Sequence, residues 1–122
     1  MVTAVTSFGR SGLADWLIQR VSAVVLAAYV IFITGFIVAT PDMTFETWSA
    51  LFDSLCMRVF SLVTLISIIA HAWIGLWSVV TDYVTNRLMG GKATALRLLA
   101  LALIAIVSVT YLVWGIEILW GF

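Results

Sequence analysis

Three long apolar runs separated by two short polar stretches make up most of this 122-residue chain. The runs cover residues 16–39, 58–81 and 96–120. Each is long enough to cross a bilayer core of ~30 Å as a helix that rises ~1.5 Å per residue. Because a continuous apolar run of this length is typical of a membrane-spanning helix, we predict an all-α integral membrane protein with three transmembrane helices. The whole chain, residues 1–122, then forms a single membrane-anchor domain.

The first polar stretch, residues 40–52, predicts a sharp turn followed by a short helix. Pro41 ends the preceding helix because proline cannot continue it. Threonines and aromatic residues follow, and their spacing favours a short helix lying at the membrane surface. The second stretch, residues 82–95, contains Gly90 and Gly91, which we interpret as its turn.

The two polar stretches also differ in charge, and the difference predicts an orientation. The first is acidic and the second is basic. By the positive-inside rule, the N-terminus and the second stretch face the cytoplasm and the C-terminus faces the periplasm. The basic residues that support this orientation are Arg10, Arg20, Arg87, Lys92 and Arg97, and Arg58 falls on the opposite side.

Composition agrees with a membrane protein and excludes other classes. Hydrophobic residues make up 64% of the chain and charged residues 10%, whereas about a quarter of a soluble domain is charged. The net charge is zero, so no nucleic acid or charged soluble substrate is indicated. The single cysteine, Cys56, excludes an internal disulfide, and we interpret it as a small apolar filler. Three helices enclose little interior, so we expect a partner and a heteromeric helix bundle.

The only histidine, His71, lies in the middle of the second apolar run. An ionisable side chain at membrane depth is costly and indicates a functional site. Helical spacing places it in a stripe of small or polar residues, which suits the close approach of another helix or of a flat macrocycle. This small-residue stripe consists of Thr64, Ser67, His71, Gly75, Ser78 and Asp82. Three roles stay open for His71: an axial ligand to haem iron, a hydrogen bond across a helix interface, or a proton relay.

As a haem ligand, His71 needs a second axial ligand, from another subunit or from a methionine, because the chain has one histidine. We expect the Nδ1 proton of His71 to be held by the backbone carbonyl of Ser67, one turn earlier. Arg20 lies about one turn inside the first apolar run and is a candidate counterion for a haem propionate. The alternative is that Arg20 extends outward to the membrane surface.

Asp82 and Tyr83 form a second candidate site, where the second apolar run ends. They follow His71 by about 11 residues, or roughly 16 Å along a helix. A tyrosine hydroxyl there can donate a hydrogen bond to a quinone carbonyl, and a nearby carboxylate can manage the protons. The alternative is an aromatic-belt tyrosine beside an aspartate at a helix end.

The segments FGRSGLADWLIQRVSAVVLAAY and IIAHAWIGLWSVVTDYV, followed by a basic loop and a third helix, resemble the small membrane-anchor family of bacterial succinate dehydrogenases. The resemblance covers nearly the whole chain, and HAWIGLWSVVTDY is its most specific part. It implies a subunit of the bacterial inner membrane that pairs with a second cytochrome b anchor subunit. This pair carries an iron–sulfur subunit and a flavoprotein subunit on its cytoplasmic side, as a heterotetramer.

The resemblance also implies the site residues. One haem b lies between the two anchors, with His71 as an axial ligand to its iron and Arg20 near its propionates. Ubiquinone is bound by Tyr83, with Asp82 beside it. The chain is then a non-catalytic subunit of an enzyme that passes electrons from succinate to ubiquinone, in the tricarboxylic acid cycle and the respiratory chain. Departures from the enterobacterial pattern are Ala14, where histidine is common, and a longer second loop.

Three alternative functions are open. A fumarate reductase anchor has a similar topology and runs the reaction in reverse with menaquinone, although the central histidine argues against its haem-free versions. A small multidrug or proton-coupled transporter would place a carboxylate inside a helix, whereas the candidate acids here lie near helix ends. A purely structural assembly factor would not depend on His71.

Overall fold

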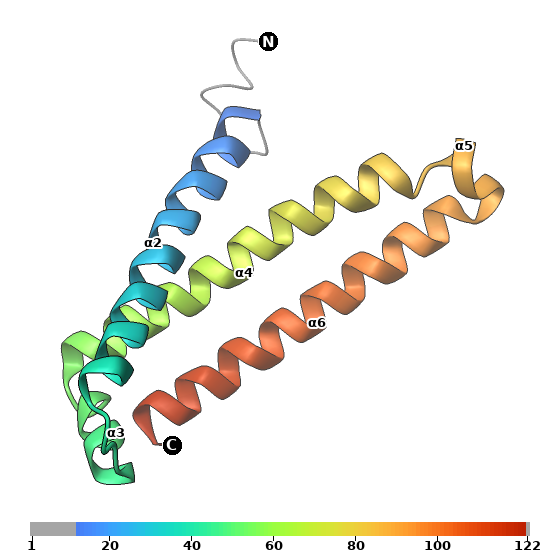
Figure 1. The fold of residues 1–122 in the computed structure, drawn as a ribbon. Helices are drawn as coiled ribbons and strands as arrows, with labels where there is room; N and C mark the ends of the chain where they lie inside the picture. The colour runs from blue at the N-terminus through green and yellow to red at the C-terminus, as the bar shows by residue number, and fades with distance from the viewer. Residues whose placement is uncertain (1–11, 122) are drawn as a thin grey trace.

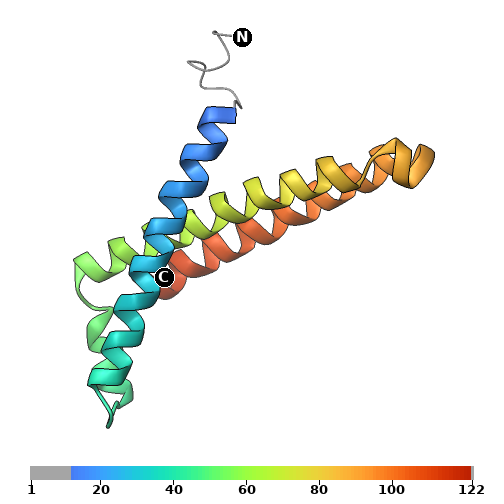
Figure 2. The ribbon, with the colours of Figure 1, turned by 45° about the horizontal axis from the view of Figure 1, so that its top comes forward.

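The computed structural model describes residues 12–121, so Arg10, one of the residues behind the predicted orientation, lies outside the described residues. Three long helices dominate it: α2 (Gly12–Ala39), α4 (Leu55–Tyr83) and α6 (Ala93–Trp120). Figures 1 and 2 both show α4 and α6 running antiparallel side by side, while α2 crosses α4 at a steep angle. The middle helix, α4, packs against both of the others.

Within the described residues, three helices are long and apolar enough to cross a membrane. The chain has almost no interior of its own, and large apolar side chains point outward along every helix. Val38 is 75% exposed and Ile118 is 68% exposed. Such a surface would be an aggregation hazard in water, but it suits contact with lipid or with partner helices. The predicted all-α membrane fold with three transmembrane helices is therefore confirmed.

The helices extend beyond the apolar runs that predicted them. α2 begins at Gly12, α4 covers Leu55–Tyr83, and α6 begins at Ala93. The start of α4 is set by a cap, since the Ser54 hydroxyl accepts a hydrogen bond from the backbone N–H of Met57 at 3.2 Å. Hydropathy marks the part of a helix that suits hydrocarbon, whereas caps and turns decide where the helix ends.

The first connection has the predicted form. α2 ends at Ala39, before the proline, and a short helix, α3 (Phe45–Leu51), follows. Its N-cap is Thr44, whose hydroxyl accepts from the backbone N–H of Thr47 at 3.2 Å. Cys56 lies in the first turn of α4, near a helix start as predicted, and it is exposed within this chain.

The second connection is shorter than predicted, because α4 extends to Tyr83 and α6 begins at Ala93. It consists of a short helix α5 (Asn86–Met89) and a 3-10 turn η1 (Gly90–Lys92). Gly90 has a φ of 70°, a left-handed conformation that favours glycine, in agreement with the predicted turn. The guanidinium of Arg97 on α6 donates to the backbone carbonyl of Val84 at 2.7 Å and so ties the connection to α6.

Candidate functional site

The small-residue stripe of α4 lies mainly against α2, so another helix covers much of it. Thr64 is buried, with 4% of its surface exposed. Ser61, beside the stripe, lies 2.7 Å from the hydroxyl of Tyr29 on α2. A Cβ added at Gly75 would lie 3.8 Å from the Nε2 atom of Gln19, an ordinary packing distance. The stripe therefore lets α2 approach α4 closely, as small residues do in membrane bundles.

His71 contacts α2 through one nitrogen of its ring. Its Nδ1 atom lies 2.9 Å from the hydroxyl oxygen of Ser22, a buried residue of α2 with 4% exposure. The expectation that the Ser67 carbonyl holds this nitrogen is wrong. The partner comes from the neighbouring helix, because the small Ser22 lets α2 come within hydrogen-bond distance of the imidazole.

Arg20 and His71 line the same pocket between α2 and α4, which has a volume of about 350 Å³. Asp15 and Gln19 on α2 and Ser78 on α4 also line it. The pocket therefore brings together an imidazole, a guanidinium and smaller polar groups at a depth where the rest of both helices is mostly apolar. Two of the four predicted site residues meet here.

The guanidinium of Arg20 lies over an aromatic ring one turn earlier on α2. Its central carbon is 5.6 Å from the ring centroid of Trp16, within the range of a cation–π contact. Within residues 12–121, Arg20 forms no ion pair with a carboxylate. Its positive charge is therefore open to an anion that enters the pocket.

Gln19 adds a polar group that the sequence-based prediction missed. Its Oε1 atom is buried and has no hydrogen-bond donor among the described residues. A buried acceptor left without a donor costs ~1–3 kcal/mol, so a polar group entering the pocket would relieve an existing cost. The signal was present in the sequence, because an amide directly before Arg20 interrupts an apolar run.

Asp82 and Tyr83 lie elsewhere, at the last turn of α4. Both are exposed, and Tyr83 has 63% of its surface accessible. Among residues 12–121 neither side chain has a hydrogen-bond partner, so both are available to a ligand or to another subunit. In Figure 1 this end of α4 leads into α5, away from the region where α2 crosses α4. The predicted site residues therefore lie at two separate candidate sites.

The described residues hold no group of three or more His, Cys, Asp and Glu side chains that could bind a metal ion. A metal held at His71 would therefore need further ligands from outside this part of the chain.

The chain is similar to known proteins both in its family pattern and in its sequence along most of its length. The family model described as the succinate dehydrogenase/fumarate reductase transmembrane subunit matches residues 3–112. The succinate dehydrogenase hydrophobic membrane anchor subunit of Coxiella burnetii is 38% identical to this chain over 111 residues, which cover 91% of this chain and 90% of that protein. Both matches span His71, Arg20, Asp82 and Tyr83, and they confirm the resemblance predicted from the sequence.

Proposed function

The chain belongs to the succinate dehydrogenase/fumarate reductase transmembrane subunit family, and from this premise we propose that it anchors a succinate:ubiquinone oxidoreductase. In that complex it helps to hold haem b and ubiquinone and provides a docking platform for the iron–sulfur and flavoprotein subunits. A second cytochrome b anchor subunit pairs with it. The Coxiella burnetii relative is named as a succinate dehydrogenase anchor, which favours this reaction over the reverse one.

The observation that carries the haem proposal is the shared pocket of His71 and Arg20. The residues present fit the group. His71 would bind the iron through a ring nitrogen, and Arg20 would offer its positive charge to a propionate. As the family resemblance implies, the other protein ligand to the iron would come from the partner anchor. Bound haem would supply a one-electron redox centre, while His71 and Arg20 would orient it.

The quinone proposal rests on the end of α4. The exposed hydroxyl of Tyr83 can donate a hydrogen bond to a quinone carbonyl, and Asp82 beside it can manage protons. The hydrogen bond from Arg97 to the Val84 carbonyl holds the residue after Tyr83 and so limits movement of the helix end.

We assign this end to the cytoplasmic side of the bacterial inner membrane, with the C-terminus in the periplasm. The second connection and the start of α6 carry Arg87, Lys92 and Arg97 and no acidic residue, as the positive-inside rule requires. The soluble subunits then dock beside Tyr83, where electrons from succinate reach the quinone.

The test is a reduced-minus-oxidised visible spectrum of the complex that copurifies with this chain, for wild type and for His71→Ala. We expect a b-type spectrum that the substitution removes or alters, together with succinate–quinone activity in the wild type. Ser108→Ala, on α6, is the control and leaves the spectrum unchanged. A wild-type complex without haem would contradict the haem role and leave the quinone role to stand on Tyr83.

The family description also includes fumarate reductases, so the direction of the reaction needs its own measurement. Activity should be compared with ubiquinone and menaquinone analogues in the same membranes. We expect succinate oxidation with ubiquinone to be faster. Preferred oxidation of menaquinol would assign the chain to a fumarate reductase.

A further inference from the structure

We propose that Ser22 is a positioning residue for the haem ligand, because its hydroxyl oxygen accepts the Nδ1–H hydrogen bond of His71. This contact selects the tautomer of His71 that leaves the lone pair of Nε2 available to iron. The inference rests on the proposed function, since the tautomer matters to haem only if His71 binds it. It adds a residue of α2 to a site whose ligand lies on α4.

The direction of this hydrogen bond follows from the second contact of Ser22. Its hydroxyl donates to the backbone carbonyl of Gln19 at 3.1 Å. A serine hydroxyl has one proton, so toward His71, at 2.9 Å, the oxygen acts as an acceptor. The Nδ1 atom of His71 therefore carries the proton. In a neutral imidazole the other nitrogen, Nε2, is then unprotonated, which is the state that ligates a metal.

Burial makes this hydrogen bond strong enough to select a tautomer. Ser22 has 4% of its surface exposed, so water does not compete for its oxygen. Within residues 12–121, Nδ1 has no partner other than this oxygen. The same contact fixes the rotation of the ring, because α2 holds one edge while the ring lines the pocket that it shares with Arg20.

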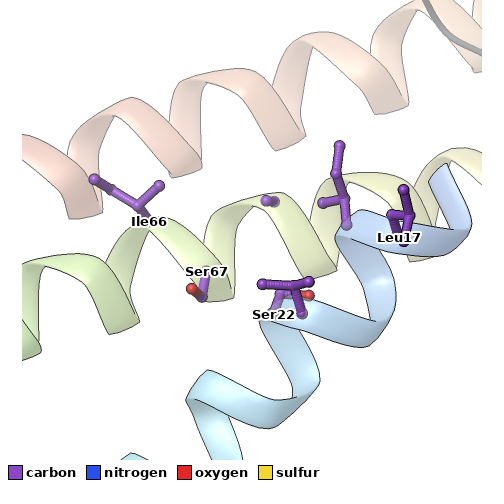
Figure 3. Close-up of a pocket in the computed structure, with 7 residues that line it drawn as sticks. Leu17, Ser22, Ile66 and Ser67 are labelled. Carbon is purple, nitrogen blue, oxygen red and sulfur yellow. The ribbon is translucent and has the colours of Figure 1, made fainter. Parts of the chain in front are cut away.

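Figure 3 shows a second pocket between α2 and α4. Ser22 on α2 and Ser67 on α4 line a neighbouring, mostly apolar pocket of about 270 Å³. The hydroxyl of Ser67 makes no hydrogen bond with the described residues, although Ser67 lies one turn from His71 on the same helix. The two serines therefore offer a matched pair, one in contact with the imidazole and one beside it.

The expected effect is on the haem potential. A hydrogen bond accepted from Nδ1–H raises the basicity of the ligating nitrogen, and a more basic ligand favours ferric iron. Removing the acceptor should therefore shift the midpoint potential to a more positive value. The ferric haem signal in electron paramagnetic resonance should also change, because the ring is free to rotate.

The experiment uses the purified complex containing this chain, as wild type, Ser22→Ala, Ser22→Thr and Ser67→Ala. We expect Ser22→Ala to keep a b-type spectrum with a more positive midpoint potential in a redox titration. Ser22→Thr keeps a hydroxyl and should keep the wild-type potential. Ser67→Ala removes the same hydroxyl group from the neighbouring position and should also match the wild type.

The outcomes separate this inference from the proposed function. Equal potentials for wild type, Ser22→Ala and Ser67→Ala, with haem lost in His71→Ala, would overturn the role of Ser22 and keep the haem site. A wild-type complex without haem would overturn both. If Ser22→Ala does not assemble, Ser22→Cys replaces it, since a thiol fills the space but is a weak acceptor. A wild-type potential in Ser22→Cys would then overturn the role of Ser22.

Discussion

The two faces of α4 hold their neighbouring helices by different means. The face toward α2 uses polar contacts between helices, Ser22 with His71 and Tyr29 with Ser61. The face toward α6 uses shape, because a Cβ at Gly115 would collide with the side chain of Leu65. In a bilayer, helices gain little from leaving lipid and associate through close packing and interhelical hydrogen bonds. The helix α4 therefore uses both modes of association, interhelical hydrogen bonds toward α2 and close packing toward α6.

The difference in contacts matches a difference in chemistry. The pocket between α4 and α6, of about 240 Å³, is lined by aliphatic residues and Ser108 and contains no ionisable side chain. The pocket of about 350 Å³ between α2 and α4 contains Arg20, Asp15 and His71. Polar contacts fix the position of particular atoms, whereas packing of small residues fixes only the distance between helix axes. The α2 face is therefore the one suited to orient a cofactor, and α6 serves to support α4.

The largest expected effect comes from disrupting the packing of α6 against α4. In Gly115→Leu, the new side chain has to displace Leu65 and push α6 away from α4. Overpacking of this kind costs ~1–3 kcal/mol. We expect less assembled complex and a lower midpoint of thermal unfolding in detergent, with haem retained in the fraction that assembles.

The matched control for this change is Gly35→Leu. Gly35 lies on α2 with nothing within 4 Å of its added Cβ, so the same substitution meets open space within this chain. Both substitutions raise the helix propensity of their position equally. The difference in stability between the two variants therefore reports the packing of α6 against α4. Equal stability of the two variants would show that the close approach at Gly115 does not hold α6.

A second prediction tests whether α4 has a binding role only at the pocket that it shares with α2 or also at its end, at Tyr83. If Tyr83 donates the proposed hydrogen bond to the quinone, Tyr83→Phe removes an interaction worth ~0.5–1.5 kcal/mol, and KM for a ubiquinone analogue should rise by up to about tenfold. The haem spectrum should not change, since Tyr83 lies at the end of α4 and does not line the pocket of His71. Tyr111→Phe, at an exposed position of α6, is the control. An unchanged KM would assign Tyr83 to the aromatic belt.

Much of this fold follows from the sequence, because each part depends on one local signal. The lengths of the apolar runs predicted three helices, Pro41 predicted the end of α2, and Gly90 predicted the turn. The helix ends were less predictable. α4 begins at Leu55 because Ser54 caps it, and a cap lies in a polar stretch where hydropathy carries no signal.

The candidate site was predictable where a residue is unusual for a membrane helix. A single histidine and an arginine inside apolar runs are costly there, so His71 and Arg20 stand out in the sequence. Ser22 does not, since its contact with His71 depends on the angle at which α2 crosses α4. The sequence-based choice of Ser67 as the partner of Nδ1 was wrong for this reason, because it considered one helix alone.

A third prediction sharpens the account of the α2 face. In Arg20→Gln, the pocket loses a positive charge. A nearby positive charge favours reduced haem, because reduced haem carries less positive charge than oxidised haem. Its loss should therefore make the midpoint potential of the haem more negative. This shift is opposite in sign to the one expected for Ser22→Ala. Because the Arg20 side chain is exposed in this chain, we expect a modest loss of haem affinity, about two- to fivefold.

The control for Arg20 is Arg58→Gln. Arg58 donates to the Phe52 carbonyl at 2.9 Å, near the start of α4, and does not line the pocket of His71. Its substitution should leave the potential unchanged. A similar shift in both variants would point to a general effect of charge on the complex instead of a contact with a propionate.

The smallest expected effect concerns the hydrogen bond between Tyr29 and Ser61, at 2.7 Å. If polar contacts stabilise the α2 face, the two groups should be coupled in a double-mutant cycle of Tyr29→Phe and Ser61→Ala. Hydrogen bonds between membrane helices contribute about 0.6 kcal/mol on average, so we expect a coupling of that size in the unfolding free energy in detergent. The ring of Tyr29 also packs edge-on against Phe60 at 5.0 Å, and phenylalanine keeps that contact. A coupling near zero would mean that ring packing alone holds this part of α2, and the contrast between the two faces of α4 would then reduce to the region around His71.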